Sequence, residues 1–118
     1  MIAACPCGPS TYASCCAPLH LGERQAETAE ELMRSRYSAF ALGELDYLVR
    51  TWHPRTRPAD LELPDRQWRG LRIIDTVAGG PQDETGVVEF VASYAGGEQH
   101  ERSTFTRCGG RWLYLAPA

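Results

Sequence analysis

Lysine is absent from these 118 residues, and all twelve basic side chains are arginines. The arginines are scattered along the chain, which indicates a codon bias toward high-GC triplets rather than selection for bidentate anion recognition. Acidic residues number fifteen, so the formal net charge is −3. A chain without excess positive charge does not attract the phosphate backbone of nucleic acids. We therefore expect no nucleic-acid partner.

Long apolar runs are absent too. No segment approaches the roughly 18 consecutive apolar residues of a membrane helix, and residues 1–5 lack the charged and apolar regions of a signal peptide. We therefore expect no membrane contact and a cytoplasmic location. A reducing cytosol keeps thiols free, so closely spaced cysteines there favour a metal site over a disulfide framework.

The most distinctive pattern is a cluster of cysteines near the N-terminus. Four of the five cysteines fall within twelve residues, in a C-x-C-x7-C-C spacing: Cys5, Cys7, Cys15 and Cys16. Turn-forming residues 8–10 allow the chain to fold back and bring the two pairs together. Four thiolates close a tetrahedral shell and leave no position for water, so we predict a structural zinc site.

Other interpretations of the cysteines remain open. The vicinal Cys15 and Cys16 could form a redox dithiol, the four thiols could pair as disulfides after isolation, or His20 could replace one thiolate at the metal. We interpret His20 itself as a surface residue just past the cluster. Cys108, beside a pair of glycines, is expected to be a small apolar side chain rather than a nucleophile.

Two helices are predicted after a polar connector at residues 17–27. Thr28 and Glu31 form a capping box and Gly43 gives a stop, which indicates a helix of about fourteen residues between the two signals. A second helix at residues 44–52 follows almost at once. The cysteine cluster should pack on the domain, because the connector is too short for a flexible tether.

Beyond residue 68 the hydrophobic period changes to two, and pairs of glycines recur. This pattern predicts four strands, at residues 70–77, 86–94, 100–107 and 111–115. Short connections make them an antiparallel meander, one face of which the helices cover. The predicted fold is α+β: an N-terminal zinc knuckle, then two helices packed on a curved four-stranded antiparallel sheet.

Two charged residues interrupt the faces that this roll should bury. Arg36 lies in the apolar stripe of the first helix, and Glu101 shares a strand face with Ser103 and Phe105. We predict that Arg36 and Glu101 pair across the layer, because an unpaired buried charge is costly. The alternative is that Arg36 extends along the rim into solvent.

Several segments resemble one family. The chain resembles the YchJ family of bacterial proteins in residues 31–40 (ELMRSRYSAF), 47–48 (YL), 51–54 (TWHP), 101–105 (ERSTF) and 110–114 (GRWLY). The cysteines resemble the family's SEC-C motif, a zinc knuckle also found in the translocase SecA, although seven rather than eight residues separate the two pairs. The resemblance implies a knuckle at residues 1–22 and a cone-shaped, cystatin-like or nuclear-transport-factor-2-like (NTF2-like) domain at residues 23–118.

The resemblance implies no assigned biochemical activity. The first hypothesis is a small binding or adaptor protein whose knuckle is structural or contacts a protein partner, and whose cone holds a small ligand. The alternative is an enzyme of the isomerase or dehydratase kind, with His53 and Glu101 as proton-transfer groups. Its pocket would be lined by Arg36, Tyr37, Tyr47, Trp52, His53, Glu101 and Ser103. Ligand, partner and oligomeric state are not specified by the sequence.

Overall fold

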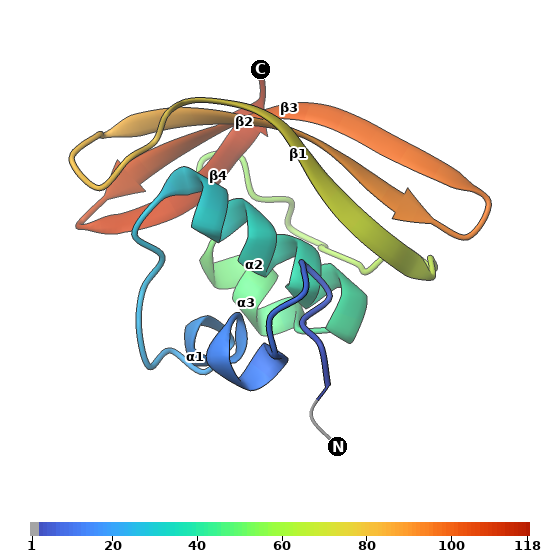
Figure 1. Cartoon of the computed structure of the whole chain (residues 1–118). Coiled ribbons are helices and arrows are strands. Elements are labelled where there is room, and N and C mark those ends of the chain that lie inside the picture. The colour runs from blue at the N-terminus through green and yellow to red at the C-terminus, as the bar shows by residue number, and fades with distance from the viewer. Residues whose placement is uncertain (1–2) are drawn as a thin grey trace.

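The computed structural model describes residues 3–118. A short 3-10 helix (Tyr12–Ser14) and three α-helices precede four strands (Figure 1). The helices are α1 (Ala17–His20), α2 (Ala29–Leu42) and α3 (Leu45–Arg50); the strands are β1 (Trp68–Ala78), β2 (Thr85–Tyr94), β3 (Gly97–Cys108) and β4 (Arg111–Pro117). The predicted α+β class and the order of helices before strands are confirmed.

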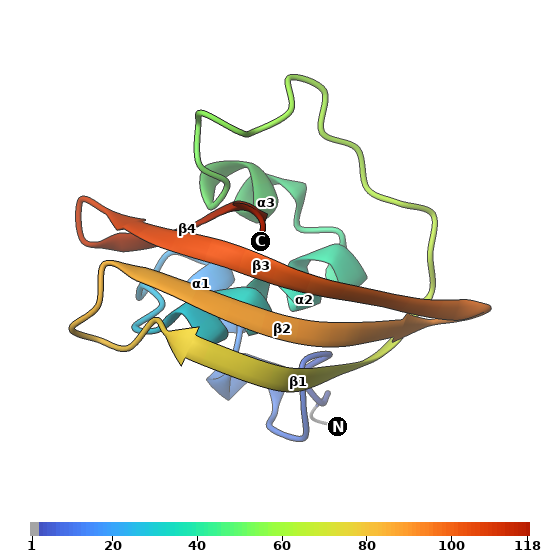
Figure 2. The same ribbon diagram turned by 90° about the horizontal axis from the view of Figure 1, so that it is seen from above.

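The sheet is an antiparallel meander in the order β1-β2-β3-β4. Its curved inner face lies over α2, and the outer face is not covered by a helix (Figures 1 and 2). Each predicted strand lies within an observed one, and most of the observed strands extend further. The largest extension is in β3, because only Ala95 and Gly96 separate it from β2, so hydrogen bonding continues to the turn.

The long helix α2 has the predicted ends. Thr28 Oγ1 accepts a hydrogen bond from Glu31 N at 3.0 Å, and Gly43 ends the helix in the left-handed conformation with φ 79°. The other half of the predicted capping box differs. The Glu31 carboxylate does not return to Thr28; it accepts a hydrogen bond from Glu27 N at 2.8 Å and pairs with Arg24. No helix within residues 3–118 is long and apolar enough to cross a membrane.

The shorter helices differ more from expectation. Helix α3 is shorter at both ends than the predicted segment 44–52. Its C-terminal end comes earlier because residues 51–53 pair with β4. There Tyr114 N donates to Thr51 O, and His53 N donates to Tyr114 O, each at 2.8 Å. Helix α1 lies inside the segment expected to be a connector. Only four residues long, it contains too few positions for a helical period to appear in the sequence.

Helix α2 is buried on two sides. Leu32 and Met33 belong to a core that extends to Phe90 and Phe105 of the sheet, while Ser35 and Ser38 are fully buried beneath the N-terminal segment. The start of the helix approaches the β1–β2 hairpin closely. A Cβ added at Gly79 would lie 2.8 Å from Ala29 Cβ, so only glycine fits there.

Candidate metal centre and ligand cavity

The N-terminal segment folds into a small hairpin that places the first cysteine pair. Ala4 and Thr11 form an antiparallel bridge, and Cys5 N donates to Ser10 O at 2.7 Å across the turn. The second pair lies at the start of α1, where Cys16 is the residue before Ala17. The predicted chain reversal at residues 8–10 is therefore confirmed, and it brings the two pairs together.

The four cysteine sulfurs converge on one point. All four Sγ atoms lie within 4.8 Å of one another. The separations are 3.6 Å for Cys7 to Cys15, 3.7 Å for Cys7 to Cys16 and 3.9 Å for Cys15 to Cys16. Zinc–sulfur bonds of about 2.3 Å in a tetrahedron give neighbouring sulfurs about 3.8 Å apart. The donor set therefore fits a tetrahedral cation that prefers thiolate ligands.

The protonation states within the cluster differ. A hydrogen bond from Cys16 lowers the pKa of Cys7 to about 5. Burial, followed by the hydrogen bond to Cys7, raises the pKa of Cys15 to about 12, and the hydrogen bond to Cys7 raises that of Cys16. One thiolate is stabilised by its neighbours, whereas four adjacent thiolates need a cation between them.

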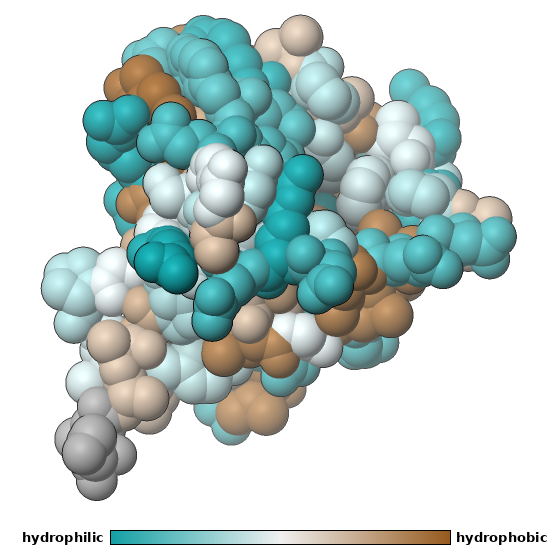
Figure 3. Space-filling model, turned by 90° about the vertical axis from the view of Figure 1, so that its right-hand side faces the viewer, coloured by the Kyte–Doolittle hydropathy of each residue, from teal (hydrophilic) through white to brown (hydrophobic). Residues whose placement is uncertain are grey.

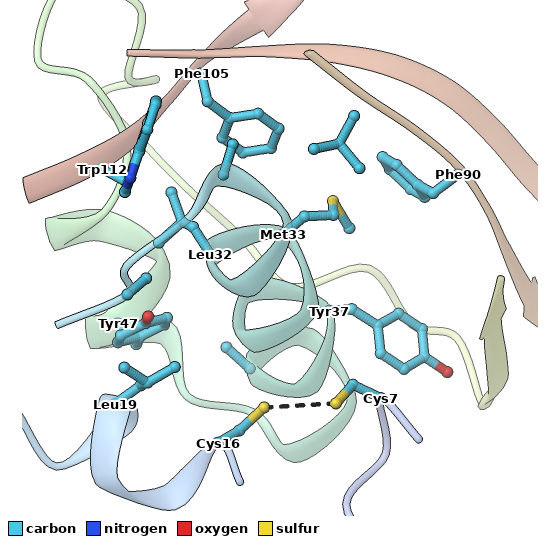
Figure 4. Close-up of a cluster of buried hydrophobic side chains, with 14 of the residues drawn as sticks. Cys7, Cys16, Leu19, Leu32, Met33, Tyr37, Tyr47, Phe90, Phe105 and Trp112 are labelled. Carbon is cyan, nitrogen blue, oxygen red and sulfur yellow. Dashed lines mark hydrogen bonds between the residues drawn. The ribbon is translucent and has the colours of Figure 1, made fainter. Parts of the chain in front are cut away.

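Two side chains of α2 hold this cluster. Ser38 Oγ lies 3.4 Å from Cys5 Sγ, and Arg34 donates from Nη1 to Cys7 O at 3.0 Å. Figure 4 shows Cys7 and Cys16 on one side of α2, with Met33 and Phe90 on the other. Such partners orient the ligands of a metal site.

His20 is buried and is not a metal ligand in this arrangement. Its Nε2 donates to Ser35 O at 2.8 Å, so the neutral ring accepts at Nδ1 from Tyr12 OH at 2.7 Å. The ring also packs on Tyr47, with centroids 4.7 Å apart. The expectation of a surface histidine is wrong, because α1 turns His20 inward against α2. Cys108 lies exposed at the end of β3, beside the hairpin turn.

The predicted pocket residues divide among several places. Arg36, Trp52, Glu101 and Ser103 line one cavity of about 150 Å³ between α2 and the sheet. Tyr37 lines a neighbouring cavity of about 160 Å³. Tyr47 lies on the other side of α2, against His20. His53 lines neither cavity, so the proposed proton-transfer pair of His53 and Glu101 is not assembled.

The predicted ion pair between Arg36 and Glu101 is not formed. Arg36 is 4% exposed and donates from Nη1 to Leu48 O at 3.0 Å and to Thr51 Oγ1 at 2.7 Å. Glu101 instead accepts hydrogen bonds from Ser103 Oγ and, at 3.1 Å, from Tyr114 OH. The alternation of faces was predicted correctly, but it does not fix positions along the helix and strand axes.

Sequence reasoning missed Tyr114 in the cavity. Its ring lies at a centroid distance of 5.1 Å from Trp52, in an edge-to-face arrangement, because residues 51–53 pair with β4. That pairing joins a loop to a distant strand, and no local pattern indicates it. Met33, Phe40 and Phe90 also line the cavity. Helical periodicity placed Met33 and Phe40 in the apolar stripe of α2, whereas strand alternation did not decide which face of β2 is buried.

Comparisons with known proteins match this architecture. Together, the fold and the four thiols define a small α+β roll with an N-terminal cluster of four cysteines whose geometry fits a metal ion. A family model described as "YchJ, middle NTF2-like domain" matches residues 28–117. A UPF0225 protein of Streptomyces coelicolor is 56% identical over 112 residues, which cover 93% of this chain and 90% of the relative. The chain belongs to the YchJ (UPF0225) family.

Related proteins and solved structures extend over nearly the whole chain. A UPF0225 protein of Deinococcus radiodurans is 50% identical over 121 residues, covering 97% of this chain and 88% of the relative. The solution structure of a SEC-C motif containing protein from Rhodopseudomonas palustris has a TM-score of 0.79 and 37% identity. The match covers 97% of this chain and 96% of that one. The crystal structure of a SEC-C motif containing protein from Psychrobacter arcticus has a TM-score of 0.78 and 31% identity. The match covers 97% of this chain and 81% of that one.

Proposed function

We propose that this protein is a cytosolic binding module, in which the four cysteines hold one structural zinc ion and the outer surface of the knuckle contacts a protein partner. The convergence of the four Sγ atoms within 4.8 Å carries the zinc assignment. Cys5, Cys7 and Cys16 are at most 4% exposed, and a closed set of four thiolates leaves no ligand position for a substrate. The free state of all five cysteines fits a reducing compartment.

The surface around the knuckle supports a protein contact. A groove of about 340 Å³ lies beside the metal centre, lined by Cys15, Cys16 and Leu19 together with the first turns of α2. Leu21, just after α1, is 71% exposed. On the face seen in Figure 3, apolar side chains form separate patches between hydrophilic ones. Small patches suit a modest, separable contact rather than an obligate interface.

Elemental analysis tests the zinc assignment. We expect one zinc per chain after purification under reducing conditions from zinc-supplemented medium. Cys16→Ser should lose most of the metal, whereas Cys108→Ser, at the exposed cysteine, should retain it. Less than about half an equivalent of zinc in the wild-type protein would contradict the assignment.

Two matched leucine variants test the partner surface. We expect immobilised wild-type protein to retain a specific partner that Leu21→Glu no longer retains. Leu42→Glu, at an exposed leucine that ends α2, should retain it as well as the wild type. Equal retention by Leu21→Glu and Leu42→Glu would place the contact elsewhere.

A further inference from the structure

The cavity between α2 and the sheet is separate from the metal centre. Its volume is about 150 Å³, and it shares Met33, Phe40, Phe90 and Gln99 with the neighbouring cavity of about 160 Å³. The two spaces therefore adjoin along one largely apolar and aromatic wall. Together they have the size and lining of a site for a small organic molecule with a ring.

Arg36 provides the charged end of this cavity. Its guanidinium lies over the rings of Trp52 and Tyr114, at 5.0 and 4.9 Å from their centroids, and only Nη1 makes hydrogen bonds. Among residues 3–118, Nε and Nη2 have no hydrogen-bond partner and no carboxylate forms a salt bridge with the group. The side-chain donors that are both fully enclosed and unpaired belong to other residues. Nε and Nη2 of Arg36 are therefore not fully enclosed by protein atoms.

A buried guanidinium with neutral partners is poorly compensated. Burial lowers the pKa of Arg36 to about 10, which is the direction expected when a charge loses its hydration. The Nε and Nη2 pair forms the planar fork that matches both oxygens of a carboxylate. An anion in the cavity would pair directly with Arg36, whereas Glu101 attracts the guanidinium without forming an ion pair with it.

Glu101 provides an acceptor at a second point of the same cavity. Its Oε2 accepts from Ser103 Oγ and Tyr114 OH, and its Oε1 has no hydrogen-bond partner within the described residues. Tyr114 connects the two charged groups, with its ring face against Arg36 and its hydroxyl on Glu101. The guanidinium and the carboxylate with its free oxygen therefore both contact Tyr114 and line the same cavity.

We propose that this cavity binds a small cyclic monocarboxylic acid, whose carboxylate accepts from Nε and Nη2 of Arg36 and whose hydroxyl or amino group donates to Glu101. Glu101 makes the site selective, because a second carboxylate on the ligand would meet a like charge. Arg66 adds positive charge near the opening, where it donates to Gln99 Oε1 at 3.0 Å. This ligand site goes beyond the function proposed for the knuckle and does not depend on it.

Calorimetric titration with matched probes tests the ligand class. We expect 4-hydroxybenzoate or 4-hydroxyphenylacetate to bind with a Kd below about 1 mM. The corresponding neutral amides should bind at least about tenfold more weakly, because they cannot pair with Arg36. Terephthalate, a dianion of similar shape, should bind at least about tenfold more weakly as well.

Variants of the two polar groups locate the binding. Arg36→Met should weaken 4-hydroxybenzoate binding at least about tenfold, while Arg69→Met, at an exposed arginine, should leave it unchanged. Glu101→Gln keeps an acceptor but removes the charge, so it should improve terephthalate binding at least about fivefold. The Glu101→Gln result stands even if Arg36→Met does not fold.

Three results would overturn the proposal. The first is no binding of either hydroxy acid, and the second is equal affinity for an acid and its amide. The third is terephthalate binding that does not change in Glu101→Gln. Zinc content enters none of these measurements, so failure of the ligand site and failure of the metal assignment are distinguished.

Discussion

The two sides of α2 satisfy their polar groups in different ways. Toward the knuckle, Ser35 and Ser38 are 0% exposed and their hydroxyls are paired, Ser35 with Tyr47 OH at 2.7 Å and Ser38 with Cys5 Sγ at 3.4 Å. Toward the sheet, Arg36 retains unpaired donors beside a cavity. Complete pairing inside the protein indicates a structural site, whereas buried groups left unpaired beside a cavity indicate a place for a ligand.

Breaking the knuckle should have the largest effect on stability. We expect Cys16→Ser to lower the free energy of unfolding by at least about 4 kcal/mol, because metal binding is coupled to folding and Cys16 is 2% exposed. Urea unfolding with zinc measured in parallel checks this. Cys108→Ser is the control and should change stability by less than about 0.5 kcal/mol. Equal stability of the two variants would show that the knuckle is dispensable for the fold.

Removing the link between α1 and α2 should have the next largest effect. We expect His20→Ala to cost about 2–4 kcal/mol, because it leaves Ser35 O and Tyr12 OH without their partner and creates a cavity against Tyr47. Thermal unfolding measures the loss. His53→Ala, which changes a histidine outside both cavities, should cost under about 1 kcal/mol. A small loss in His20→Ala would mean that α1 is held by the metal centre alone.

On the sheet side, a carboxylate deletion should cost less. We expect Glu101→Ala to lower stability by about 1–2 kcal/mol, through lost hydrogen bonds to Ser103 and Tyr114. A buried ion pair would instead cost about 3–5 kcal/mol when broken. The double variant with Arg36→Met separates the two cases, because a direct ion pair couples the two losses strongly, whereas contact through the shared partner Tyr114 couples them weakly. Coupling as large as that of a direct ion pair would contradict the structure.

The smallest effect is expected on the uncovered outer face of the sheet. Hydrogen bonds from His100 and Arg102 hold the pKa of Glu89 below its ordinary value. A lowered pKa stabilises the folded state above the unfolded pKa, and this contribution disappears as the pH falls through the folded pKa. Wild type should therefore be slightly more stable than Glu89→Gln at pH 7, and the difference should shrink as the pH falls below the ordinary pKa of a glutamate and vanish below the folded pKa. A difference in stability that persists at low pH would show that packing, rather than the charge of Glu89, is its cause.

Local signals predicted the fold well. Thr28 and Gly43 set both ends of α2 because a capping hydroxyl and a left-handed glycine act within one turn of chain. Alternation similarly placed Phe105 on the face toward the helices, together with Glu101 and Ser103. Helix α1 was not predicted, since four residues that include a proline carry no period, and the burial of His20 depends on that helix.

The candidate sites were predicted unequally for a similar reason. The four cysteines of the candidate metal centre are close in sequence, so spacing alone indicated their convergence. The cavity combines α2, the segment after α3, and strands β2 to β4, and its shape depends on the curvature of the sheet. Tyr47 was expected to line the cavity, but it lies on the other side of α2. Helical spacing gives buried positions on both faces, so it does not show which of them face the cavity.

Cobalt substitution tests the metal centre most directly, because the absorption of Co²⁺ reports ligand type and geometry. The four sulfurs, all within 4.8 Å of one another, predict one Co²⁺ per chain with intense thiolate-to-metal charge transfer and the visible bands of a tetrahedral ion. Zinc should displace it, and Cys16→Ser should lose most of the charge-transfer intensity. Weak absorption typical of six-coordinate Co²⁺, or bands unchanged in Cys16→Ser, would contradict the tetrathiolate site.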